Sequence, residues 1–395
     1  MNEKEIYFDN AATTRLDDEV LNEMLPYLKD YYGNPSSIYK LAQKNKNAIE
    51  RARQDIADVF NCRASEIYFT SGGTESDNWA IKSIAEAYKS KGKHIITSAI
   101  EHHAVLNSCK YLESHGFRVS YLKVDKNGLI DENELKKNIC DDTILISVMF
   151  ANNEIGTIQD IKKLAEIAHE KNILFHTDTV QAVGYIKIDL KDLGVDAMSI
   201  SAHKFYGPKG VGALYLNKKI KVLPYLHGGA QEFSKRAGTE NVAGIVGMAK
   251  ALKLAYNNLG KNNLYVKDLR DKIIDGVLNN ISHVKLNGDR EKRLANNINF
   301  SFEFIEGESL LLMLDAKNIF ASSGSACTSG SLDPSHVLLA IGLPHELAHG
   351  SLRITLGKHN TQEEVDYFLN VLPDIVKKLR DMSPLYEEYL NKNNL

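Results

Sequence analysis

Short apolar runs alternate with amphipathic stretches from about residue 16 to residue 260, and this rhythm restricts the fold more than any other feature of the chain. The runs are four to six residues long, rich in β-branched and aromatic residues and bounded by polar residues or glycine, as buried strands are. One helical stretch repeats apolar residues on a single face, at Ile161, Leu164, Ala165 and Ala168. We therefore expect an α/β domain with a mostly parallel sheet, whose ligand site lies beyond the carboxyl ends of the strands. The predicted strands cover residues 67–70, 94–97, 118–122, 143–148, 173–176 and 197–200.

After about residue 260 the pattern changes to longer, charged helices with few strands, of which 297–302 is one. The chain has 395 residues, and at about 150 residues per domain this length allows two or three domains. We find no internal repeat, low-complexity tract or proline-rich linker. The sequence therefore predicts a second, α+β domain after a boundary near residues 255–265.

The charge of the chain is nearly balanced, with 48 lysine and arginine residues, 51 aspartate and glutamate residues and a net charge of −3. This balance gives no support to nucleic-acid or membrane binding, and the basic stretch at 40–53 is interpreted as a solvated helix face of mixed charge. The polar N-terminus lacks the apolar run of a secretory signal, and no uninterrupted apolar stretch approaches 18 residues. We expect a cytoplasmic protein.

Two glycines follow the predicted strand at 67–70, and a helical pattern begins directly after them. Gly72 and Gly73 allow backbone N–H groups to approach an anion at a helix N-terminus, where the helix dipole favours negative charge. Thr74 and Asp77 have the spacing of a capping box. Taken alone, these residues are more simply interpreted as a glycine turn with a cap, and no nucleotide-binding glycine motif is present here.

Two charged residues, Asp178 and Lys204, come just after predicted strands. A carboxylate at that end of a parallel sheet can hold a protonated ring nitrogen, and a lysine there can act as an amine nucleophile. A surface loop is the commoner place for either residue. Together with an anion cradle, however, the two residues match what pyridoxal phosphate requires of a protein.

Several further motifs carry a family resemblance. With the N-terminal run at 6–14, they occur in the order and approximate spacing of the cysteine desulfurases of the NifS/IscS type, and the chain resembles that family almost to its C-terminus. The resemblance implies an α/β fold of the aspartate-aminotransferase type (fold type I of the pyridoxal-phosphate enzymes), with a large domain at 16–260 and a small domain formed by 1–15 and 261–395. The motifs are GNPSS (33–37), TESDN (74–78), EHHAV (101–105), NNEIG (152–156), RAGTEN (236–241) and SSGSAC (322–327).

The resemblance also implies which residues surround pyridoxal 5′-phosphate. Lys204 is expected to bond to the cofactor as a Schiff base, Asp178 to pair with its pyridinium nitrogen and Gln181 to bond its ring hydroxyl. His102 is expected to stack on the ring and to assist proton transfer. The implied phosphate holders are Gly73, Thr74, Ser201 and His203, joined by Thr239 of a second copy of the chain.

Substrate binding follows from the same resemblance. Asn153 and Arg353 are expected to clamp the ring and the substrate carboxylate, with Asn34 as a further substrate-binding residue. Arginine suits this task because its planar fork binds a carboxylate through two parallel hydrogen bonds.

Four cysteines are spread over the chain without a C-x-x-C pair, which argues against a disulfide framework or a zinc ribbon. Cys327 has small neighbours, which suits a loop, at about 321–333, that reaches into a site. Cys62, Cys109 and Cys140 lie in helical or amphipathic surroundings, where a free cysteine is usually a packing residue. We therefore expect Cys327 alone to be a nucleophile, acting as its thiolate.

The implied reaction removes sulfur from L-cysteine, releases L-alanine and leaves a persulfide on Cys327. The implied partners are a second copy of the chain and a sulfur acceptor, either an iron–sulfur scaffold of the NifU/IscU type or a carrier protein for tRNA thiolation. Other reactions on the same fold remain open, namely a selenocysteine lyase or an aminotransferase. A non-catalytic assembly subunit is a further alternative.

One motif points to a different chemistry. His345 and His349 match H-E-x-x-H, in which two histidines one helical turn apart bind zinc and the glutamate serves as a base. A flanking proline and glycine predict a short helix, and Thr355 stands where the third ligand of one zinc-protease class is expected. Glu363 and Glu364 are more distant candidate ligands, so a zinc hydrolase stays an alternative, although we expect no metal.

Overall fold

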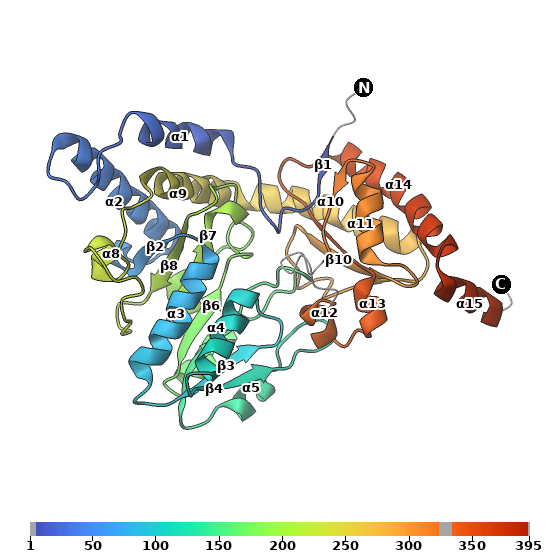
Figure 1. Cartoon of the computed structure of the whole chain (residues 1–395), viewed down its shortest axis with the longest axis horizontal. Helices are drawn as coiled ribbons and strands as arrows, with labels where there is room; N and C mark the ends of the chain where they lie inside the picture. Colours follow the sequence, from blue (N-terminus) through green and yellow to red (C-terminus); the bar gives the residue numbers. More distant parts are fainter. Residues whose placement is uncertain (1–4, 324–333, 394–395) are drawn as a thin grey trace.

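The computed structural model describes residues 5–323 and 334–393. Its largest sheet has seven strands in the order β2-β8-β7-β6-β5-β3-β4 (Figure 1). The pairings from β7 through β6, β5 and β3 to β4 are parallel, whereas β8 runs antiparallel to both of its neighbours. The expected mostly parallel sheet is therefore confirmed. Its strands are β2 (Ile67–Thr70), β3 (His94–Ser98), β4 (Arg118–Leu122), β5 (Thr143–Ser147), β6 (Leu174–Asp178), β7 (Ala197–Ser201) and β8 (Gly212–Leu216).

All six strands predicted for this region are present, and β8 is the one that was not predicted. Its sequence, Gly-Ala-Leu-Tyr-Leu, carries little β-branched signal, because alanine and leucine favour helices. All five residues are buried, and β8 lies between β2 and β7. Its strand conformation is therefore set by the sheet around it.

Apolar side chains cover both faces of the sheet, because successive residues of a strand point to opposite sides. Ile96 and Ile146 belong to one core, and their neighbours Ile95 and Leu145 belong to another. The helices packed on the first core are α1 (Asp18–Lys29), α2 (Lys40–Phe60), α5 (Glu132–Asn138), α6 (Ile161–His169), α7 (Leu190–Leu193) and α9 (Val242–Asn257). Those on the second core are α3 (Gly73–Tyr88) and α4 (His103–Glu113). The helix predicted around Ile161 is confirmed as α6, with the expected face buried.

The C-terminal part has its own antiparallel sheet, β12-β10-β9, and its own core, which also receives the N-terminal strand β1 through parallel pairing with β11 (Figure 1). The predicted strand at 297–302 is β10. Among the described helices, none combines the length and the apolar character needed to cross a membrane. The elements are β1 (Ile6–Tyr7), β9 (Val284–Leu286), β10 (Asn297–Phe302), β11 (Ile319–Phe320), β12 (Ser351–Thr355), α8 (Gln231–Ser234, before the C-terminal part), α10 (Leu259–Asn280), α11 (Gly307–Asp315), α12 (His336–Ala340), α13 (His345–His349), α14 (Gln362–Asp381) and α15 (Pro384–Asn393).

Phe8 fixes the N-terminal segment to this C-terminal core. Its fully buried ring meets Phe368 of α14 edge to face, with centroids 5.8 Å apart. We predict that Phe8→Ala lowers the free energy of unfolding by about 3–5 kcal/mol, because it removes a buried aromatic ring and leaves a cavity. Urea unfolding measures this loss. Leu312→Ala, at a side chain that is 65 % exposed on α11, is the control and is expected to change little. An equal loss in both variants contradicts the anchoring role of Phe8.

Candidate active site

The carboxyl ends of β6 and β7 bring Asp178 and Lys204 together. Asp178 is the last residue of β6, and Lys204 ends the short 3-10 turn η2 (Ala202–Lys204) that follows β7. Burial raises the pKa of Asp178 to about 6, although the hydrogen bond from Val180 and the positive charge of Lys204 both act to lower it. Val180 donates its N–H to Oδ1 at 2.8 Å, which leaves the carboxyl group with acceptor capacity for a further donor.

Backbone carbonyls of the N-terminal segment bind the side chains of Lys204 and Gln181. Lys204 Nζ donates to the carbonyl oxygens of Ala11 at 2.5 Å and Ala12 at 2.8 Å. Gln181 Nε2 donates to the same Ala11 oxygen at 2.9 Å. Ala11 and Ala12 were not predicted as site residues, since a backbone carbonyl leaves no signal in the type of its residue.

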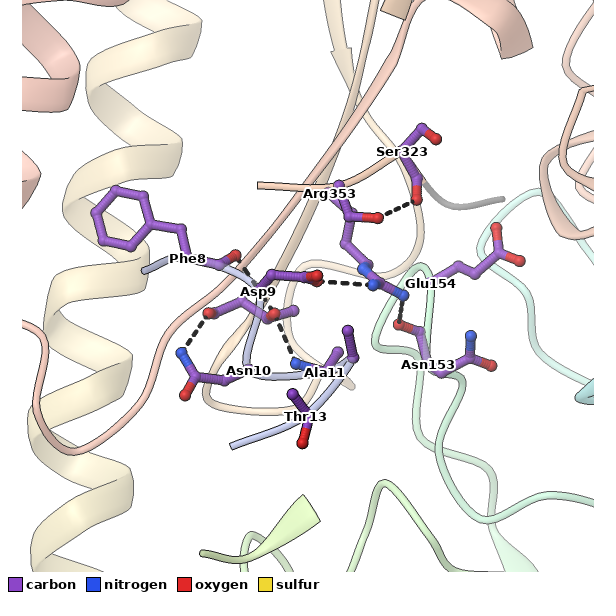
Figure 2. A network of polar contacts seen from close by, with 12 residues as sticks. Phe8, Asp9, Asn10, Ala11, Thr13, Asn153, Glu154, Ser323 and Arg353 are labelled. Carbon is purple, nitrogen blue, oxygen red and sulfur yellow. Dashed lines mark hydrogen bonds and ion pairs between the residues drawn. The ribbon is translucent and has the colours of Figure 1, made fainter. Parts of the chain in front are cut away.

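Arg353 of β12 lies in a polar network that links the C-terminal sheet to the N-terminal segment and to the loop after β5 (Figure 2). Its Nη2 pairs with Asp9 Oδ1 at 2.9 Å, and its Nη1 donates to the Asn153 carbonyl oxygen at 3.2 Å. The side chain is 3 % exposed, and its Nε has no hydrogen-bond partner among the described residues. A buried N–H without an acceptor is unfavourable, so the site is suited to a ligand that brings one, such as a carboxylate. Asp9 was not predicted from the sequence.

Two predicted histidines are held in the neutral form. His102 is the N-cap of α4, and its Nδ1 accepts a hydrogen bond from the Ala104 N–H at 3.1 Å, which leaves the proton on Nε2. Burial, followed by the charge of Lys204, lowers the pKa of His102 to about 4. His203 has its pKa lowered to about 4 by the same two causes, and its Nδ1 lies 3.1 Å from Thr13 Oγ1.

The N-terminus of α3 lies against the end of β7. Gly72, the N-cap, has no side chain to occupy the N–H groups of the first turn. A Cβ on Gly72 would lie 3.7 Å from Ser201 Oγ, so this hydroxyl faces the same helix end. Gly73 is required by packing, because a Cβ there would approach Val180 Cγ2 to 2.5 Å. This end of the helix is therefore suited to an anion.

The predicted capping box at Thr74 and Asp77 is wrong. The helix begins at Gly73, so Thr74 is its second residue and is exposed. Asp77 is buried, with Oδ1 3.7 Å from His176 Nε2. The physical reason is that the sheet recruits Asp77 into a buried polar group, which a local sequence pattern does not reveal.

Two predicted site residues, Asn34 and Thr239, do not join this cluster. Asn34 is exposed between α1 and α2, where its Oδ1 accepts a hydrogen bond from the Ser36 N–H. Thr239 is exposed between α8 and α9. Cys327 lies outside the described residues, so its place in the site stays a prediction.

The other cysteines are poor nucleophiles or lie apart from the site. Burial raises the pKa of Cys62 and of Cys109 to about 12, so both stay protonated thiols at neutral pH. Cys140 is exposed at the far end of the sheet, just before β5.

The zinc alternative finds no support in the described part of the chain. His345 and His349 lie on a helix of five residues, as predicted, with ring centroids 4.7 Å apart. Within residues 5–323 and 334–393, one group of at least three metal-binding side chains is present, and it consists of His94, Cys140 and Asp142. Neither histidine of the motif belongs to it.

The comparisons with known proteins agree with the fold. The family model of the class V aminotransferases matches residues 6–368. A cysteine desulfurase IscS of Methanosarcina thermophila is 59 % identical over 97 % of this chain and 94 % of its own length, and one of Clostridium botulinum strain Hall is 56 % identical over 98 % of each. A solved NifS-like protein has a TM-score of 0.90 at 42 % identity, covering 95 % of this chain and 100 % of its own. The structure "SspA in complex with cysteine" has a TM-score of 0.79 at 37 % identity, covering 91 % and 100 %.

Fold and site together define a protein of the class V aminotransferase family, with the fold expected from the sequence. Within that family, the chain belongs to the cysteine desulfurases.

The pKa of Asp178 predicts how cofactor binding depends on pH. A pKa of about 6 means that the carboxylate, which attracts a protonated ring nitrogen, predominates above pH 6 and is lost below it. We expect the dissociation constant of added pyridoxal 5′-phosphate to rise about tenfold from pH 7 to pH 5, measured by absorbance. Asp178→Asn is the control, because it leaves only the titration of the cofactor itself. The same pH dependence in both proteins excludes Asp178 as the partner of the ring nitrogen.

Proposed function

We propose that the chain uses pyridoxal 5′-phosphate to remove sulfur from L-cysteine, releasing L-alanine and holding the sulfur on Cys327. The observation that carries this proposal is that Lys204, whose charge acts on Asp178 at the end of β6, and Arg353 of β12 both contact the N-terminal segment. The family membership and the relatives named as cysteine desulfurases agree with it.

The residues of the site fit the cofactor. The carboxyl group of Asp178 can hold the ring nitrogen, and Gln181 can reach the ring hydroxyl. The N-terminus of α3, with Ser201 and His203, can hold the phosphate. When bound, the cofactor supplies an electron sink that weakens the bonds at the substrate Cα and Cβ.

Three side chains of the site would act on the substrate. Lys204 would hold the cofactor through its amine and, as a free amine, would take the proton from the substrate Cα. Neutral His102, which carries its proton on Nε2, can donate that proton within the site. Arg353, fixed by Asp9 and the Asn153 carbonyl, binds the substrate carboxylate through its remaining N–H groups.

Cys327 is the proposed nucleophile. Its thiolate attacks the sulfur of the bound cysteine, an S–S bond forms, and the Cβ–S bond breaks with its electron pair leaving on carbon. Protonation of that carbon gives L-alanine, and the enzyme keeps a persulfide. The overall change, L-cysteine plus a thiol giving L-alanine plus a persulfide, balances without an external oxidant. The proposed acceptor is an iron–sulfur scaffold, or alternatively a carrier for tRNA thiolation.

A second copy of the chain is proposed to complete the site. Exposed apolar side chains gather on α1 and in the loop between α1 and α2, with Tyr32 at 79 % and Ile38 at 95 % exposure. Such a surface on one side of a protein is typical of an interface. Asn34 lies in the same loop, and neither it nor Thr239 serves the site of its own copy, so both are available to a partner.

The nucleophile can be tested with Cys327→Ser. We expect alanine formation from L-cysteine in the presence of an acceptor thiol to fall by more than about a hundredfold, because serine cannot accept sulfur as a persulfide. The visible absorbance of lysine-bound cofactor is expected to remain. Cys140→Ser is the matched control and is expected to retain full activity. Normal alanine formation by Cys327→Ser contradicts the proposal, and transamination of a keto acid independent of Cys327 identifies an aminotransferase.

The dimer can be tested with Ile38→Glu. A charge placed in an apolar interface is expected to raise the dimer dissociation constant at least tenfold, or about 1.4 kcal/mol, in sedimentation equilibrium. Leu385→Glu, at a side chain 55 % exposed on α15, is the control and is expected to leave the dimer intact. Weakening by Leu385→Glu alone places the interface elsewhere.

A further inference from the structure

Three successive residues in the segment before Thr239 have a left-handed backbone. Glu232 has φ 45° and ψ 49°, Phe233 has φ 57° and ψ 38°, and Ser234 has φ 62°. For side chains other than glycine this conformation is unfavourable, and three in succession are rare. Strained backbone persists only where the surrounding structure holds it in place, which is common at functional sites.

A buried ion pair holds this strained turn. Arg53 of α2 forms two parallel hydrogen bonds with Glu232, of 2.8 and 2.7 Å, and the two side chains are 3 % and 4 % exposed. Glu232 also accepts the Phe69 N–H at 2.8 Å, and Arg53 donates to the Ile67 carbonyl oxygen at 2.7 Å. The pair thus links the turn to the backbone of Ile67 and Phe69 in β2. The interpretation of residues 40–53 as a solvated face is wrong for Arg53, because tertiary contacts bury it.

Aromatic rings cover the same pair. The guanidinium carbon of Arg53 lies 4.7 Å from the ring centroid of Phe69 and 5.2 Å from that of Phe233. Stacking of this kind favours the cation and excludes water from the ion pair. Phe233, one of the three left-handed residues, therefore contacts the buried ion pair directly.

A second arginine–carboxylate pair ties the segment to α3. Arg236 Nε and Nη2 donate to the two oxygens of Glu75 at 2.8 and 3.1 Å, and Glu75 also accepts the Ser71 N–H at 2.8 Å. Two backbone hydrogen bonds close the segment, from Tyr225 to Lys235 at 2.7 Å and from Ala237 to Leu226 at 3.1 Å. We call residues 225–241 the Thr239 loop.

Both ion pairs contact the short stretch that runs from β2 to the first turn of α3. Phe69 lies in β2, and Ser71 and Glu75 flank the glycines at the N-terminus of α3. The Thr239 loop and the candidate phosphate cradle are therefore fastened to one another within a single copy of the chain.

We propose that Arg53 and Glu232, with Arg236 and Glu75, are positioning residues that set the Thr239 loop for phosphate binding in the site of the partner copy. The inference rests on the proposed cofactor and dimer. Its consequence is that damage to the Glu232 pair in one copy weakens phosphate binding in the other copy. A merely structural ion pair has no such effect across the interface.

Mixed dimers test this in trans. In the first, one copy carries Lys204→Ala and Glu232→Gln and the other is unchanged, so lysine-bound cofactor can form only in the unchanged copy, which receives the altered loop. In the second, Lys204→Ala is in one copy and Glu232→Gln in the other, so the site with Lys204 receives an intact loop. The dissociation constant for pyridoxal 5′-phosphate is read from the visible absorbance. We expect it to rise at least tenfold in the first dimer and less than twofold in the second, relative to a dimer with Lys204→Ala alone.

Pyridoxal, which lacks the phosphate, gives the second readout. The first dimer is expected to bind pyridoxal as the reference dimer does. Equal weakening in both dimers, no weakening in either, or equal weakening for pyridoxal overturns the proposal. Absence of the lysine-bound absorbance in the unchanged protein, or of a dimer, instead contradicts the proposed function and is seen before any loop variant is made.

Two further variants complete the test, one as a substitute for Glu232→Gln and one as a control. Arg236→Gln breaks the second, less deeply buried pair and leaves the Arg53–Glu232 pair intact. It is used in the same mixed dimers if Glu232→Gln does not fold, with the same expected direction. Asp55→Asn is the matched control, because it breaks a surface ion pair between α2 and Lys253 of α9, of 3.1 Å, and is expected to leave cofactor binding unchanged.

Discussion

The hydrogen bonds from Lys204 to the carbonyl oxygens of Ala11 and Ala12 are the contacts on which the site depends most. The segment that offers these oxygens also supplies Asp9 to Arg353, and Phe8 anchors it in the C-terminal core. It therefore joins the amine at the end of β7 to the guanidinium on β12, which belong to different sheets. Without that segment, neither sheet alone would present both an amine and a carboxylate-binding group to one small molecule.

Burial sets the charge state of this site. It raises the pKa of Asp178, lowers those of His102 and His203, and so favours a neutral environment in which the few remaining charges count strongly. Glu101, also buried, has its pKa raised to about 8. A small zwitterion such as L-cysteine brings one carboxylate and one amino group, which matches a site with one buried guanidinium and one amine.

Local patterns predicted the parts of the fold whose signal is local. The strands at 94–97 and 297–302 and the buried face of α6 followed from apolar periodicity, and Asp178 and Lys204 were placed at strand ends by the same reasoning. The failures have a common cause. Thr74 was assigned a cap and Arg53 a solvated position because their true partners, the sheet around Asp77 and the carboxylate of Glu232, lie far away in the sequence. Asp9 lies in the N-terminal run that carries the family resemblance, but its partner on β12 is remote in the sequence.

The amino-acid sequence by itself determined the alternation of strands and helices, the family resemblance and the residue types available for chemistry, since these depend on periodicity and on short motifs. Tertiary structure alone decided which groups meet: the carbonyl oxygens with Lys204, Asp9 with Arg353, and Arg53 with a strained turn before Thr239. The reason is that hydrogen bonds and ion pairs depend on distances of about 3 Å, and distances between remote residues are set only when the sheets pack and bury them.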